Sequence, residues 1–119
     1  MLYALLFYGS EDDWHRLDRA GRQRVMAAHV EELNRANADG TLVTSLRLLR
    51  TDSATTVRVP GGRVTVLDGP FAETKEQLGG LQILDCEHLD AAIRYAATFA
   101  AHMGTVEIRP VHPDPDSLD

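Results

Sequence analysis

The sequence predicts an α+β fold in which two helices cover one face of a sheet, the ferredoxin-like split βαβ arrangement with an inserted β-hairpin. Strand-like and helix-like segments follow one another in the order β-α-β, hairpin, β-α-β. The chain has 119 residues, 44% of them hydrophobic, which suits one domain with a single core. The first strand is apolar on both faces, so a second covering layer is expected, and a second copy of the chain supplies it most simply.

The N-terminal third predicts a strand followed by a long helix. Residues 2–8 are aliphatic and aromatic and are followed by glycine, which is typical of a strand. Ser10 and Asp13 have the spacing of a capping box. Apolar residues at helical spacing then predict a helix over 11–37, with Gly21 dividing a short first helix from the main one.

The middle of the chain predicts a strand and then a hairpin. Residues 42–49 are expected to form the second strand. Two β-branched runs, 55–59 and 63–67, flank Pro60-Gly61-Gly62, and this pattern indicates a hairpin turn. The C-terminal part adds strand 81–86, amphipathic helix 89–103 and strand 106–111. One domain is therefore expected over residues 1–111, with an irregular tail over 112–119.

The most specific local feature is the 68–80 segment, Asp-Gly-Pro-Phe-Ala-Glu-Thr-Lys-Glu-Gln-Leu-Gly-Gly. Asp68 and Gly69 are turn formers, and Pro70 restricts the glycine before it. Phe71 is available as an anchor into the core. We therefore expect a rigid, ordered crossover rather than a loose loop.

The second half of this segment predicts one turn of helix. Thr74 followed by Gln77 has capping-box spacing. Residues 75–78 would form the turn, and Gly79 in the left-handed region would close it.

The 68–80 segment resembles the signature of the DGPF-type, YCII-related family, and the runs LYALLFYG, TTVRV and VEIRPV resemble that family at corresponding places. The resemblance covers nearly the whole chain. It implies a dimeric α+β barrel without assigning one activity. Related YCII-type proteins imply a His–Asp pair in a cleft, whereas some DGPF proteins imply an association with extracytoplasmic-function sigma factors.

The resemblance also nominates site residues. His29 falls at the place of the YCII-type histidine on the first long helix. The YCII-type aspartate lies near the end of the second helix, where residues 98–103 carry no carboxylate. Asp68 or Glu73 is then the alternative partner. An imidazole titrates near neutrality and can move protons either way, but His29 also fits the role of a core or interface histidine, and Asp68 that of a turn cap.

Three further residues are candidates for substrate binding. Tyr8 would line the mouth of a cleft, although a tyrosine at a strand end is commonly packed with its hydroxyl in water. Lys75 would bind substrate or form a solvated pair with Glu73. Arg109 would bind substrate or, more simply, satisfy a carboxylate such as Glu73.

Composition argues against several classes of partner. The formal charge is −6 and the basic residues are scattered, which disfavours nucleic acid and anionic membranes. Cys86 is the sole cysteine, so no disulfide can form within the chain. No dense ligand motif predicts a metal, and no organic cofactor is expected. Residues 1–8 lack the basic start of a signal peptide, so a cytoplasmic location is expected.

Two functions therefore remain open. The first is a small-molecule enzyme or binder, with His29 as the acid–base group oriented by Asp68 or Glu73, in a cleft between the first helix, the 68–80 segment and the sheet. The second is a non-catalytic interaction protein, a partner of the transcription machinery. A closed, polar-lined pocket at His29 would favour the first, and a solid core there the second.

Overall fold

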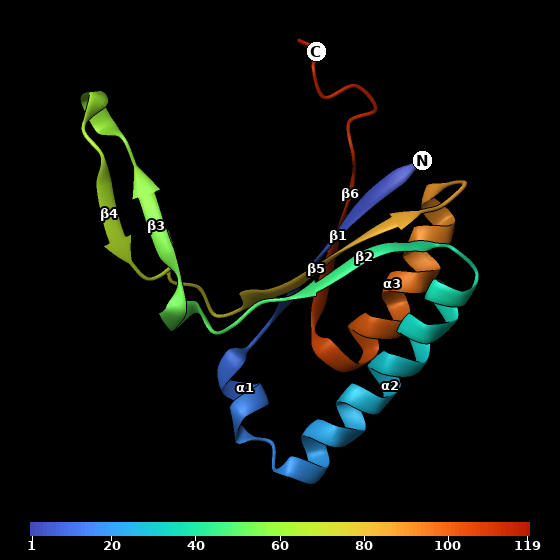
Figure 1. The fold of residues 1–119 in the computed structure, drawn as a ribbon. Coiled ribbons are helices and arrows are strands. Elements are labelled where there is room, and N and C mark those ends of the chain that lie inside the picture. The colour runs from blue at the N-terminus through green and yellow to red at the C-terminus, as the bar shows by residue number, and fades with distance from the viewer.

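The structure, a computed structural model, describes residues 1–119 with the exception of the Met103 side chain (Figure 1). In chain order the elements are β1 (Leu2–Gly9), α1 (Glu11–Arg16), α2 (Arg19–Ala38), β2 (Leu42–Arg47), β3 (Thr55–Arg58), β4 (Thr65–Asp68), β5 (Gln77–Asp85), α3 (Leu89–Met103) and β6 (Thr105–Pro110). The sequence therefore predicted the order of the strands and the main helices correctly. Residues 111–119 follow β6 without a helix or strand.

Two antiparallel sheets are present in the described chain. The main sheet has the order β2-β5-β1-β6, and every neighbouring pair is antiparallel. Strands β3 and β4 form a separate hairpin that stands away from the main sheet and the helices (Figure 1). The α+β class with an antiparallel sheet is thus confirmed.

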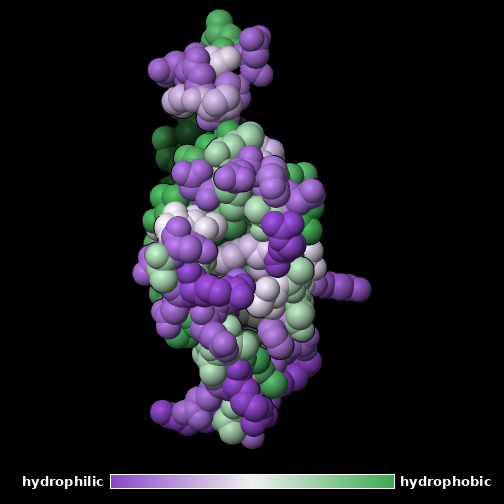
Figure 2. Space-filling model, turned by 90° about the vertical axis from the view of Figure 1, so that its right-hand side faces the viewer, coloured by the Kyte–Doolittle hydropathy of each residue, from purple (hydrophilic) through white to green (hydrophobic). Residues whose placement is uncertain are grey.

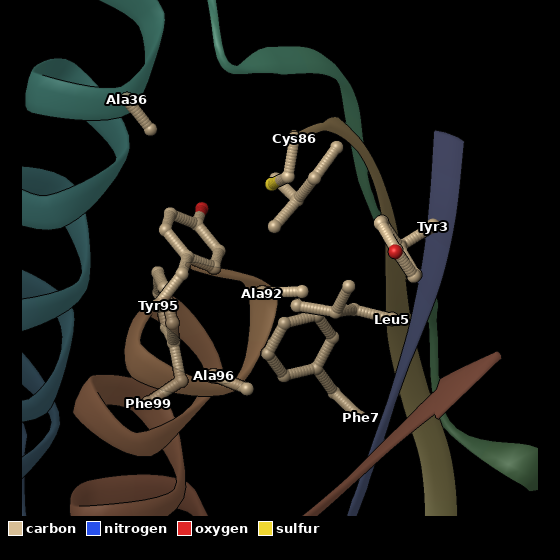
Figure 3. Close-up of a cluster of buried hydrophobic side chains, with 10 residues drawn as sticks. Tyr3, Leu5, Phe7, Ala36, Cys86, Ala92, Tyr95, Ala96 and Phe99 are labelled. Carbon is tan, nitrogen blue, oxygen red and sulfur yellow. The ribbon is translucent and has the colours of Figure 1, made fainter. Parts of the chain in front are cut away.

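The core lies between the main sheet and the helices. Tyr3, Leu5 and Phe7 alternate along β1 and are buried, as the two-residue repeat of a strand requires. Their side chains point toward α3, which contributes Tyr95 and Phe99 (Figure 3). The remaining members of this buried cluster are Ala36, Leu84, Cys86, Ala92 and Ala96. Edge contacts between Phe7 and Phe99, with ring centroids 5.5 Å apart, add to the packing.

The opposite side of the main sheet is not covered within the chain. Leu6 and Leu46 pair with Leu81 on the two sides of β5, and Ile83 lies two residues further along the same face. We call these four side chains the open face. The chain is also flat, with extents of 47 × 44 × 19 Å and a radius of gyration of 16.5 Å; a compact domain of this length would have about 13.5 Å. Seen from the side, the molecule is narrow, with a largely hydrophilic surface and hydrophobic groups toward its edges (Figure 2).

The helix starts follow the local chemistry of the sequence. The Ser10 hydroxyl accepts a hydrogen bond from the Asp13 amide at 3.1 Å, so the predicted cap of α1 is confirmed. The division between the helices differs from the prediction, because it falls at residues 17–18 and not at Gly21. Asp18 caps α2 instead, accepting a 2.7 Å hydrogen bond from the Gly21 amide.

The 68–80 segment departs from two predictions. Gly69 does have the left-handed conformation expected of a turn, with φ of 101°. The helical turn over 75–78 is wrong, because β5 already begins at Gln77 and Gly79 has no positive φ. Pairing with the neighbouring strands explains this difference, since the Leu48 amide donates to the Gly79 carbonyl at 2.9 Å. Phe71 is not a core anchor in the single chain, where it is 78% exposed.

Candidate functional site

His29 lies on α2 at the point where this helix faces both β1 and α3. Its ring centroid is 4.4 Å from that of Phe99 and 6.3 Å from that of Phe7. The ring is half-buried, and its Nδ1 is the one buried side-chain nitrogen or oxygen without a hydrogen-bond partner among the described residues. Because buried polar atoms are almost always paired, such an atom calls for an explanation.

The space beside the His29 ring is small. A cavity of about 10 Å³ lies between α2 and α3, lined by Val25, Ala28, His29, Thr98, Phe99 and His102. This volume holds roughly one water molecule. On this side of the histidine, the packing is therefore closer to a solid core than to a substrate pocket.

The surroundings of His29 favour its neutral form. Burial lowers the pKa of the imidazole from its ordinary value, and the nearby Arg47 and His102 lower it further. All three causes favour the neutral ring. A neutral imidazole with an unpaired nitrogen can accept a proton from a bound molecule at physiological pH.

Arg47 and Trp14 were not singled out by the sequence reasoning. Arg47 ends β2 opposite Gly80, and its guanidinium carbon lies 5.4 Å from the centre of the Trp14 ring. Arg22 lies over the same ring at 5.9 Å. The sequence offered one signal for this site, because Trp14 is the sole tryptophan in the chain. Nothing in the spacing of Arg47 indicated that its side chain would stack on Trp14.

The carboxylates proposed as partners of His29 lie elsewhere in the single chain. Asp68 ends β4 and pairs with Thr55 across the hairpin, while Glu73 and Lys75 are exposed in the connection that follows. Among the described residues, no hydrogen bond or ion pair joins Asp68 or Glu73 to His29. The hairpin that ends at Asp68 stands apart from α2 (Figure 1).

Tyr8 and Arg109 lie on the main sheet, away from its helix-covered face. Tyr8 follows Phe7 in the alternation of β1, so its side chain lies on the side of the open face. The sequence suggested Glu73 as the carboxylate partner of Arg109. In the structure Arg109 instead forms an ion pair with Glu107, two residues away on β6. Substrate-binding roles for these residues remain predictions.

A second, wider hollow lies between the C-terminal half of α2 and the start of α3. It has a volume of about 520 Å³, and its lining includes Glu32, Arg35, Cys86 and Tyr95. Arg35 donates to both oxygens of the buried Glu32, and the Tyr95 hydroxyl donates to Gln82 at 2.7 Å. Burial raises the pKa of the Cys86 thiol, with a further contribution from Asp85. The thiol is therefore held in its unreactive form.

The described residues contain neither a metal-binding cluster nor a membrane-spanning helix. No group of three or more His, Cys, Asp or Glu side chains in the described part of the chain is arranged to hold a metal ion. Within the same residues, no helix combines the length and the apolar character needed to cross a membrane.

The fold and the half-buried histidine define a small α+β protein with an antiparallel sheet and a candidate acid–base residue. The model of the YCII-related domain matches residues 1–113, and the chain belongs to this family. An uncharacterized protein of Rhizobium meliloti (strain 1021), R00369, is 37% identical over 114 residues, covering 93% of this chain and 92% of the relative.

A solved structure has the same fold at low sequence identity. It is 5-chloro-2-hydroxyhydroquinone dehydrochlorinase (TftG) from Burkholderia phenoliruptrix AC1100, in complex with 2,5-dihydroxybenzoquinone. The TM-score is 0.56 with 15% sequence identity, and 94% of each chain is covered. This likeness concerns the fold alone.

Proposed function

We propose that the protein is a small-molecule-binding protein or cofactor-independent enzyme in which His29 is the acid–base group. The observation that supports this most directly is the buried, unpartnered Nδ1 of His29. Leaving such an atom unpaired costs about 1–3 kcal/mol. A ligand that supplies the missing hydrogen bond would recover this free energy on binding.

The electrostatics suit His29 as a base. A lowered pKa keeps the imidazole neutral, so it can take a proton from a bound molecule and return it in a later step. Proton transfer or elimination on a small polar molecule can be catalysed by such an acid–base group without a cofactor. The structural neighbour is named a dehydrochlorinase, and loss of hydrogen chloride is an elimination.

The proposed site is completed by a second copy of the chain. The strand order β2-β5-β1-β6 supports a ferredoxin-like unit, and the open face provides an apolar surface for pairing into a dimeric α+β barrel. Asp68 or Glu73 would orient His29, and Tyr8, Lys75 and Arg109 would contact substrate. Because the single chain does not bring the 68–80 segment to His29, we propose that pairing brings the partner's Asp68, Glu73 and Lys75 closer. Tyr8 and Arg109 lie on the side of the open face, across the sheet from His29, so their contact with substrate is a separate proposal.

The hairpin offers a second reason to expect a homodimer. Val57 and Val66 pair across its strands, and Val59 and Val64 continue the same alternation toward the turn. We call these four residues the valine face, and each is more than half exposed. An isolated two-stranded hairpin is marginally stable in water, so contact with another copy would stabilise it.

The alternative is a non-catalytic interaction protein, including a partner of transcription regulators. The small volume beside His29 favours it, since about 10 Å³ admits no substrate. In this case His29 would be a packing residue between two aromatic rings, and the valine face and open face would serve association only.

A matched pair of histidine variants tests the proposal. Small polar compounds, beginning with 2,5-dihydroxybenzoquinone, are screened by NMR for binding and by absorbance for turnover. We expect His29→Asn to remain folded and to lose binding or turnover, whereas His112→Asn in the tail keeps both. A rate that falls as the pH drops below the lowered pKa of His29 would support its role as a base. Equal activity of both variants would favour the interaction protein.

A further inference from the structure

We infer that Arg47 and Trp14 form the ligand-recognition part of the His29 site, and that the ligand is a small planar anion of the carboxylate or phenolate type. This inference rests on the proposed function and gives it a substrate class. It assigns recognition to α1 and the end of β2, two places that the sequence did not indicate.

The main chain positions Arg47 on the helix-covered side of the sheet. Arg47 pairs with Gly80, which alternates with the buried Gln82 along β5. The strands approach closely here, because a Cβ atom on Gly80 would lie 2.9 Å from the Leu46 carbonyl oxygen. With no side chain at Gly80, the space above this pair of strands is left to the Arg47 side chain. The Arg47 charge is also near enough to lower the pKa of His29.

The positive charge of Arg47 is not neutralised by a carboxylate. Within the described residues Arg47 forms no ion pair, whereas Arg50, three residues later, lies within 4.0 Å of Glu11, Asp12 and Asp52. The nearby Arg22 donates to the Trp14 and His15 carbonyl oxygens instead of to a carboxylate. These two guanidinium groups therefore lie over Trp14 without a carboxylate partner among the described residues, whereas the acidic residues of α1 are paired with Arg16 and Arg50.

The Trp14 ring explains why a planar anion is expected. An indole face holds a guanidinium group in a fixed plane through the cation–π attraction. The donors at the edge of a planar guanidinium match two oxygens of one flat anion. A flat aromatic ligand would thus bind Arg47 by its anionic group.

The experiment uses Trp14 as a built-in reporter. Because it is the sole tryptophan, its indole N–H gives one assignable NMR signal, and the His29 ring proton gives a second. The 119-residue chain is titrated with 2,5-dihydroxybenzoquinone as a planar anion, with inorganic phosphate as a compact anion and with benzamide as a neutral planar compound. Arg47→Gln is compared with Arg24→Gln, which removes the same charge from an exposed position on α2, and with Arg47→Lys, which keeps the charge without the plane.

We expect 2,5-dihydroxybenzoquinone to shift both signals saturably in the wild-type protein. Its affinity should be at least about tenfold lower for Arg47→Gln and unchanged for Arg24→Gln. The affinity of Arg47→Lys should lie between those of the wild type and Arg47→Gln. The inference would be overturned if Arg24→Gln weakened binding as much as Arg47→Gln, or if benzamide or phosphate bound as tightly as 2,5-dihydroxybenzoquinone. It would also be overturned if no probe gave a saturable shift at millimolar concentration. If the Trp14 signal responds and depends on Arg47 while the His29 signal is silent, anion recognition stands and the acid–base role of His29 fails. If His29 responds equally in Arg47→Gln, the proposed function stands and the role of Arg47 fails.

Discussion

The two faces of the main sheet have similar side chains and different surroundings. On β1, Leu5 is fully buried beneath the helices, whereas its neighbour Leu6 faces the other way and stays half-exposed. On β5, Leu84 is fully buried, and Leu81 and Ile83 are not. One chain therefore has enough helix to cover one face. The apolar residues of the second face have no such cover in a single copy.

The largest expected effect tests the covered face. Leu84→Ala should lower the free energy of unfolding by about 2–5 kcal/mol, because it leaves a cavity where the native side chain is fully buried. Urea denaturation monitored by circular dichroism measures this loss. The loss should be the same at every protein concentration, since the cavity lies inside one chain. A loss that vanishes at high concentration would place Leu84 in an interface.

The next prediction concerns the open face. Ile83→Lys should convert the expected homodimer into a monomer, because an unpaired charge buried between two copies costs several kcal/mol. Light scattering at micromolar concentration should give twice the chain mass for the wild type and one chain mass for the variant. Ala101→Lys, on the exposed side of α3, is the control and should stay dimeric. A wild-type protein that is monomeric at all concentrations would refute the proposed dimer.

A smaller effect should come from the titration of His29. Its pKa is lowered in the folded chain, so near neutral pH the folded and unfolded states are both mostly neutral at this residue. As the pH falls through the unfolded value of about 6.5, the unfolded state binds the proton first and folding loses stability. The slope from one proton cannot exceed about 1.4 kcal/mol per pH unit.

The measurement compares urea unfolding of wild type and His29→Asn between pH 5 and 7.5. The stability of the wild type should fall more steeply toward acid than that of the variant. Above the unfolded pKa of about 6.5 the two curves should run parallel. Parallel curves throughout would mean that the His29 pKa does not change on folding. A variant that is steeper than the wild type would mean that folding raises the pKa of His29.

The comparison also shows what the sequence could predict. Strand order along the chain and the helix over 89–103 follow from local periodicity, and both are confirmed. Apolar residues at helical spacing predicted the long helix, yet within it Val30 is 45% exposed while Ala36 is buried. Periodicity identifies a helix without stating how much of its apolar stripe another element covers.

The candidate site was less predictable for a related reason. His29 was identified through the family resemblance. Its place beside two phenylalanine rings is set by tertiary packing. Arg47 meets Trp14 across 33 positions of sequence, and no local pattern encodes such a contact. The helical turn expected at 75–78 was lost to strand pairing of β5, since long-range hydrogen bonds outweigh a single capping box. Local rules therefore described elements better than they described contacts.

The smallest expected effect concerns Phe71 in the 68–80 segment. Its ring is 78% exposed in the single chain, while that of Phe99 is 2% exposed. In the monomeric Ile83→Lys background, Phe71→Ala should change the free energy of unfolding by no more than about 0.5 kcal/mol, and Phe99→Ala should cost about 3–5 kcal/mol. Urea denaturation of both variants at one concentration gives the contrast. If Phe71→Ala costs as much as Phe99→Ala there, the ring is packed within its own chain. If its cost appears in the dimer alone and grows on dilution, a second copy covers Phe71, and the 68–80 segment belongs to the interface.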